Sequence, residues 1–150
     1  MKNSDYSCTY TVQQTQKEVF NAICNVKGWW ELNTEGNTTM PEDKFTVRFG
    51  KTYVDFKVVE WVPEKKIAWG VTDCWLEGFK DEKEWNNTQV NFEIETAGEG
   101  SNIRMTHIGL NPEVHCYENC KKGWDFYAGV SLKQLIETGK GQPNTPQKER

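Results

Sequence analysis

The segment PEVHCYENCKKGWDFYAGVSLKQLIETG, residues 112–139, predicts one long amphipathic helix. Pro112 suits its first turn, and Gly139 suits the left-handed position that follows the last turn. One stripe at helical spacing carries Cys116, Cys120, Trp124, Tyr127, Ser131 and Leu135. A helix with one such stripe is stable only when the stripe covers another apolar surface. We therefore expect a helix from about Glu113 to Thr138 that lies across a sheet.

The chain before this helix predicts the sheet. Alternating apolar and polar residues, typical of half-buried strands, occur at about 5–12, 44–49, 54–58, 67–71, 90–94 and 103–107. A tight turn at Gly50-Lys51 joins two of these strands, so they should pair antiparallel. Thr15 and Glu18 form a capping-box pattern for a short helix through Val26, which Gly28 is placed to end. The prediction is an α+β fold with a six-stranded antiparallel sheet, a short N-terminal helical segment and a long C-terminal helix.

The length and composition predict one domain. A chain of 150 residues suits a single core, which we place at residues 1–141. Residues 142–150 are polar and include prolines, so we expect a disordered tail.

The charge and hydropathy patterns exclude several classes of partner. The net charge is −4 and no basic run occurs, which argues against nucleic-acid binding. The first residues lack the apolar core of a signal peptide, and no apolar stretch reaches membrane-spanning length. We therefore expect a cytoplasmic protein.

The five cysteines are odd in number and widely scattered, which argues against a disulfide framework. Cys116 and Cys120 lie four residues apart, so both thiols would share one helix face, and His115 is adjacent. A metal site or a redox role is therefore conceivable, but no fourth ligand is evident. Burial as small hydrophobic side chains is the preferred interpretation. We predict no metal site and no cofactor.

Several segments together resemble a known family. They are the helix at Thr15–Val26 followed by Gly28-Trp29-Trp30, THIGL at 106–110, CYENCKKGWDFY at 116–127 and SLKQLIETGKG at 131–141. From about Tyr6 to Gly141 the chain resembles the Hsp90-ATPase-activator-homologue group of the START-like (SRPBCC) superfamily. The resemblance implies a helix-grip fold, also called Bet v 1-like, in which a long helix lies across a curved sheet and encloses an apolar cavity. Relatives bind lipids, hormones or polyketide-like molecules, some are cyclases, and one branch binds the chaperone Hsp90.

The inner strand faces and the helix stripe define the candidate ligand-binding residues. They are Trp30, Phe56, Trp69, Phe92, Met105, His107, Trp124, Tyr127 and Ser131. A ligand site combines an apolar wall with a few convergent polar groups, here His107, Tyr127 and Ser131. An ordinary filled core is the alternative. Trp29-Trp30 is either the mouth of a cavity or a pair with one ring buried and the other half exposed.

Three functions remain open. The leading hypothesis is a module that binds a small hydrophobic or amphipathic molecule, lipid or polyketide-like, between sheet and helix. The second is an interaction with an Hsp90-like chaperone or another protein through exposed aromatics at Trp29, Trp30 and Trp75. The third is a cyclase-like enzyme in which His107 or Tyr127 serves as acid or base. We assign no catalytic residue.

Overall fold

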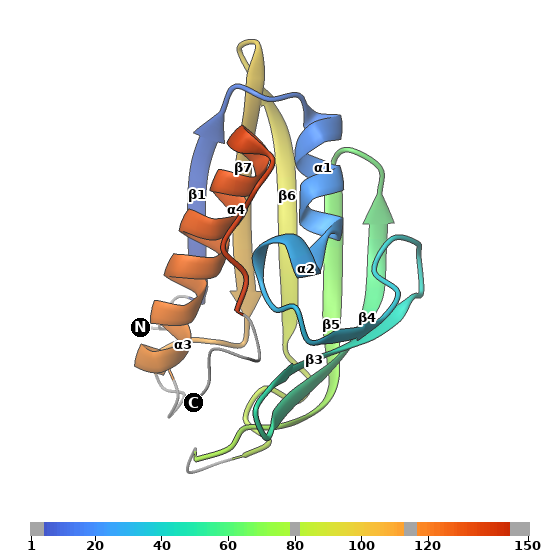
Figure 1. Cartoon of the computed structure of the whole chain (residues 1–150), viewed down its shortest axis with the longest axis vertical. Coiled ribbons are helices and arrows are strands. Elements are labelled where there is room, and N and C mark those ends of the chain that lie inside the picture. The colour runs from blue at the N-terminus through green and yellow to red at the C-terminus, as the bar shows by residue number, and fades with distance from the viewer. Residues whose placement is uncertain (1–4, 79–81, 113–116, 145–150) are drawn as a thin grey trace.

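The computed structural model describes residues 5–78, 82–112 and 117–144, and its centre is one curved antiparallel sheet (Figure 1). The seven strands are β1 (Tyr6–Val12), β2 (Thr34–Gly36), β3 (Lys44–Phe49), β4 (Thr52–Val62), β5 (Lys66–Trp75), β6 (Gln89–Ala97) and β7 (Gly100–Ile108). Their order across the sheet is β1-β7-β6-β5-β4-β3-β2, with every neighbouring pair antiparallel. The predicted α+β fold is confirmed, but the sheet has seven strands rather than six.

The strand missing from the prediction is β2. It is three residues long and only Thr34 is buried, so it shows no alternation from which a strand could be inferred. Gly36 has φ 101°, and a Cβ there would collide with the carbonyl oxygen of Lys44 on β3. Glycine is therefore required where β2 approaches its neighbour.

The N-terminal helical segment consists of two helices. The predicted capping box is present in α1 (Gln16–Cys24): Thr15 Oγ1 accepts from Glu18 N at 3.1 Å, and Glu18 Oε1 accepts from Thr15 N at 2.9 Å. The helix ends at Asn25, whose ψ of 69° leaves the helical region. A second short helix, α2 (Val26–Trp29), follows at once and contains Gly28. The prediction that Gly28 ends the first helix is therefore wrong.

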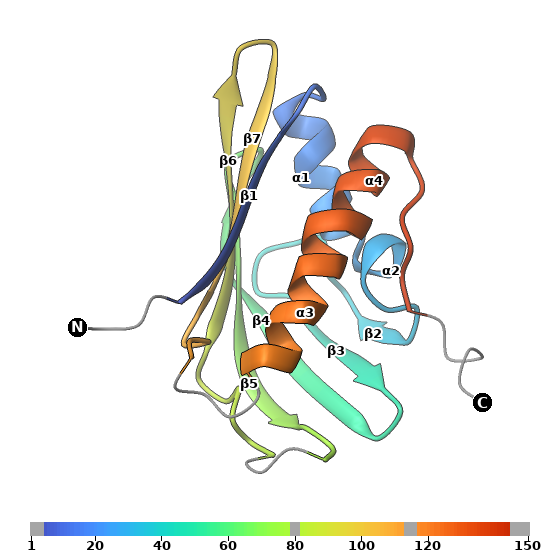
Figure 2. The ribbon, with the colours of Figure 1, turned by 90° about the vertical axis from the view of Figure 1, so that its left-hand side faces the viewer.

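The C-terminal helix lies across one face of the sheet, beside α1 and α2 (Figure 2). It comprises α3 (Tyr117–Phe126), a π-helical turn η1 (Tyr127–Ser131) and α4 (Leu132–Thr138), and Gly139 ends it with φ 86° as predicted. Residues 113–116, where the helix was predicted to begin, lie outside the described residues. No described helix is both long and apolar enough to span a lipid bilayer.

The π turn changes which side chains face the sheet. Buried apolar residues recur at every fourth position along the helix: Trp124, Ala128, Leu132 and Ile136. The predicted stripe followed a period of 3.6 residues, and its members Cys120, Tyr127 and Leu135 are only partly buried. The wider π turn accommodates one extra residue, so the buried stripe shifts by one position after Trp124.

Part of the segment predicted as a tail is bonded to the domain. Gln142 N donates to Ser131 Oγ at 2.7 Å, and Asn144 N donates to the carbonyl oxygen of Trp30 at 2.8 Å. Leu32 N donates in turn to the carbonyl oxygen of Asn144 at 3.0 Å. Residues 142–144 therefore run along the segment that joins α2 to β2, and residues 145–150 lie outside the described part of the chain.

Candidate functional site

The nine predicted ligand-binding residues meet between the sheet and the helices. Eight of them are buried and Tyr127 is half-buried. Trp30 contacts Trp124 with ring centroids 4.8 Å apart, and it contacts Phe56 at 5.7 Å. Phe92 lies 5.1 Å from Trp69. Met105 is buried on β7, where it pairs with Phe92 of β6.

Aromatic rings fill much of this space. Trp29, Trp30 and Trp69 are mutually stacked, with centroid separations of 5.9, 6.3 and 6.4 Å. Both Trp29 and Trp30 are buried, so the interpretation with one ring half exposed is wrong. The reason is that α2 turns both rings inward, onto the sheet. The indole N–H of Trp69, in the middle of this cluster, finds no hydrogen-bond acceptor among the residues described.

His107 has both ring nitrogens engaged. Trp124 Nε1 donates to His107 Nδ1 at 3.0 Å, which assigns the proton to Nε2. Nε2 then donates to Thr88 Oγ1 at 2.9 Å, and that hydroxyl donates to the carbonyl oxygen of Trp85 at 2.7 Å. Burial lowers the pKa of His107 to about 3. A neutral imidazole with both nitrogens hydrogen-bonded has no free nitrogen with which to act as a base on a ligand.

The other two predicted polar groups, the hydroxyls of Ser131 and Tyr127, differ in their hydrogen bonding. Ser131 Oγ donates to the carbonyl oxygen of Trp29 at 2.7 Å and accepts from Gln142 N, so it links the C-terminal helix to α2 and to residue 142. The Tyr127 hydroxyl makes no hydrogen bond with any residue in the described ranges. Burial raises the pKa of Tyr127, and the nearby Glu31 carboxylate raises it further.

A small apolar hollow, here called the grip pocket, opens where α3 meets the ends of β3, β4 and β5. Its volume is about 240 Å³, and its walls are Phe49, Thr52, Val54, Leu76, Glu77, Trp85 and Cys120. Two wall residues contact predicted site residues: Phe49 lies 5.9 Å from Trp30, and Trp85 stacks 6.0 Å from Trp124. The buried indole N–H of Trp85 has no acceptor within the described residues.

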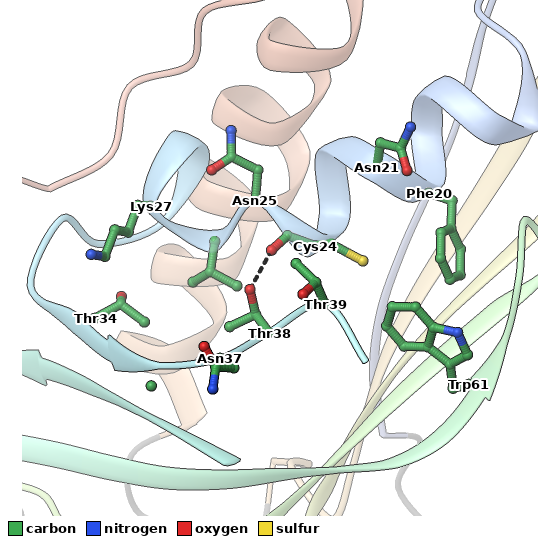
Figure 3. A pocket seen from close by; sticks show the side chains of 12 residues that line it. Phe20, Asn21, Cys24, Asn25, Lys27, Thr34, Asn37, Thr38, Thr39 and Trp61 are labelled. Carbon is green, nitrogen blue, oxygen red and sulfur yellow. Dashed lines mark hydrogen bonds between the residues drawn. The ribbon is translucent and has the colours of Figure 1, made fainter. Parts of the chain in front are cut away.

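A larger hollow, here called the outer pocket, lies between α1–α2 and the chain around β2 (Figure 3). Its volume is about 450 Å³, and its walls are Phe20, Asn21, Cys24, Asn25, Val26, Lys27, Thr34, Gly36, Asn37, Thr38, Thr39 and Trp61. None of the nine predicted residues is among them. The sequence offered no periodic signal for this pocket, because its walls come from helix ends, a short strand and a loop that only the tertiary fold brings together.

No disulfide occurs within the described part of the chain, where Cys8, Cys24 and Cys74 are free thiols. No group of three metal-ligating side chains occurs among the residues that the structure describes. The hypothesis of a metal or redox role for Cys116 and Cys120 involves Cys116 and His115, which lie outside those residues.

A curved antiparallel sheet held against a long C-terminal helix defines the chain as a START-like helix-grip domain. Residues 13–137 match the sequence model of the family described as Activator of Hsp90 ATPase homolog 1-like protein. Because the match covers most of the chain, the protein belongs to this family. The predicted resemblance is thereby confirmed.

Solved structures show the same fold at low sequence identity. The Aha1 dimer from Colwellia psychrerythraea is 22% identical, with a TM-score of 0.74 over 94% of this chain and 100% of that one. DynU16, a putative protein in the dynemicin biosynthetic locus, is 18% identical, with a TM-score of 0.70 over 93% of this chain and 49% of that one. CalU16 from Micromonospora echinospora is 13% identical, with a TM-score of 0.64 over 89% and 76%. A search of curated proteins finds no match.

Proposed function

We propose that this protein binds a small, largely apolar molecule that carries one hydrogen-bond acceptor, and that the grip pocket is where it binds. The observation that carries the proposal is the grip pocket itself, an apolar hollow between helix and sheet whose wall includes a buried indole without an acceptor. A buried unpaired donor costs about 1–3 kcal/mol, and a ligand carbonyl or hydroxyl would remove that cost if the Trp85 indole rotated to expose its N–H to the pocket.

The size of the pocket restricts the ligand. A dry apolar cavity of about 150 Å³ in another protein accepts benzene. The grip pocket, at about 240 Å³, therefore suits a molecule of one or two rings or a short acyl chain. A whole lipid or a polycyclic polyketide-like molecule requires more room, and Trp30 and Phe49 would have to move apart to provide it. The nine predicted residues then act as the wall behind the ligand rather than as its direct contacts.

Acetophenone tests the proposal, with ethylbenzene as the analogue that lacks the carbonyl oxygen. Each is titrated into ¹⁵N-labelled protein while the indole N–H signals are followed by NMR. We expect acetophenone to shift the Trp85 indole signal downfield in a saturable way, and ethylbenzene to bind more weakly without that downfield shift. If neither compound changes the Trp85 signal at millimolar concentration, the proposal fails.

A pair of helix variants provides the control. Cys120→Phe places a ring in the pocket from the α3 side and should abolish the titration. Asn119→Phe adds the same ring at the neighbouring exposed position and should leave the titration unchanged. Equal effects of the two variants would show that the ligand binds elsewhere.

The chaperone and enzyme alternatives have less support. Two of the three aromatics expected to contact a protein partner, Trp29 and Trp30, are buried. His107, one of the two residues considered for acid–base chemistry, has both nitrogens hydrogen-bonded. We therefore propose ligand binding as the function. We also propose that the protein is cytoplasmic, because thiols such as those of Cys8 and Cys120 stay reduced there.

A further inference from the structure

We propose that the outer pocket is a second binding site, and that its ligand is a small amphipathic anion with an apolar ring or chain at one end and a carboxylate at the other. The pocket shares no wall residue with the grip pocket, so this proposal stands independently of the first. Its volume of about 450 Å³ falls within the range of ordinary small-molecule sites.

One end of the outer pocket is apolar. Phe20 and Trp61 meet edge to face with centroids 5.0 Å apart, Phe20 on α1 and Trp61 near the end of β4. Phe20 is buried whereas Trp61 is partly exposed, so the Trp61 ring is open to a bound molecule. Cys24 adds to this surface, because burial raises the pKa of its thiol to about 12 and keeps it neutral.

The walls of the pocket carry hydrogen-bonding groups that the protein does not use. The side-chain amides of Asn21, Asn25 and Asn37 make no hydrogen bond with any described residue. Thr38 is used: its hydroxyl donates to the carbonyl oxygen of Cys24 at 2.6 Å and holds the loop after β2 against α1 (Figure 3). This bond keeps the loop that carries Asn37 in place beside α1.

The opposite end of the pocket is cationic. Lys27 and Thr34 lie at the end away from Phe20 and Trp61 (Figure 3). Lys27 is the only charged residue in the wall, and its ammonium has no carboxylate partner in the described residues. A lone cation in a wall without acidic groups favours an anionic ligand over a cationic one.

Three compounds that share one ring and chain test this inference: 4-phenylbutyrate, 4-phenylbutan-1-ol and 4-phenylbutylamine. Binding is followed by NMR through the Trp61 indole N–H and the asparagine side-chain amides. We expect the carboxylate to bind, the alcohol to bind about two- to fivefold more weakly, since an exposed ion pair contributes modestly, and the amine to bind weakest. An amine that binds as well as the carboxylate would overturn the proposal, as would an unchanged Trp61 signal with all three.

Matched variants assign the binding to this pocket. Lys27→Gln should reduce the affinity for 4-phenylbutyrate to that of the alcohol, whereas Lys17→Gln, on the exposed face of α1, should not change it. Asn21→Phe should block the site and Lys17→Phe should not. The grip-pocket variant Cys120→Phe should leave 4-phenylbutyrate binding intact. Loss of 4-phenylbutyrate binding in Cys120→Phe would refute the assignment. Unchanged binding in both Lys27→Gln and Asn21→Phe would refute it as well.

Discussion

At the scale of single residues, His107 makes the stability of the protein depend on pH. Its pKa is about 3 in the folded protein, against the usual 6.5. Between these two pKa values the unfolded chain binds a proton that the folded protein does not. The contribution of His107 to the unfolding free energy is therefore at its full value above the usual pKa, and it falls as the pH drops. The loss is about 1.4 kcal/mol per pH unit. We expect urea unfolding to show this slope from about pH 6 to about pH 5.

His107→Gln separates this effect from other titrations. The glutamine amide can accept from Trp124 and donate to Thr88 as the imidazole does, but it does not titrate. Carboxylates and His115 are present in both proteins. The variant should therefore be less stable than the parent at neutral pH and should lose stability less steeply on acidification. Parallel slopes for the two proteins would show that His107 is not the titrating group.

At the scale of elements, the π turn η1 depends on a contact from the edge strand β1. Tyr10 Oη donates to the carbonyl oxygen of Ala128, inside the turn, at 2.8 Å. Removing this donor takes one hydrogen bond from the Ala128 carbonyl, so Tyr10→Phe should lower the unfolding free energy by about 0.5–1.5 kcal/mol. Tyr53→Phe, which removes a hydroxyl bonded to Asp73 on the outer face, should cost less in the same urea titration. A larger loss in Tyr53→Phe would contradict the role given to Tyr10.

The elements that the sequence predicted correctly are those whose signal is local. Strand β6 alternates apolar Val90, Phe92 and Ile94 with polar residues, and that pattern follows directly from burial of one face. The π turn leaves no such signature, because its extra residue changes the helix period only locally. This is why Leu135 was expected in the buried stripe where the structure has Ile136.

At the scale of the whole molecule, the candidate sites too were predicted only where a local sequence pattern defines them. The faces of strands and helix placed Trp69, Phe92 and Trp124 together correctly, since each face follows from periodicity. Whether the space between them is open depends on Trp29 and Trp30, whose direction is set by the turn from α1 into α2. The outer pocket depends on an approach of residues 36–39 to α1, and no local pattern encodes that approach.

The segment after the C-terminal helix should stabilise the domain. Asn144 exchanges backbone hydrogen bonds with Trp30 and Leu32, and its Nδ2 donates to Glu31 Oε1 at 2.7 Å. Glu31 is fully buried, so loss of a donor to its carboxylate is costly. Ending the chain after Gly141 removes these bonds and should lower the unfolding free energy by about 2–4 kcal/mol.

The matched control ends the chain after Asn144, which keeps these bonds, and it should be more stable than the chain that ends after Gly141. The chain that ends after Gly141 should also bind acetophenone more weakly. The hydrogen bond from Asn144 N to the Trp30 carbonyl holds Trp30 in place, and the Trp30 ring packs against Phe49 in the wall of the grip pocket. Equal stability of the two truncated chains would show that residues 142–144 do not support the fold. A shorter chain that is less stable but binds acetophenone unchanged would remove the connection between the tail and the pocket.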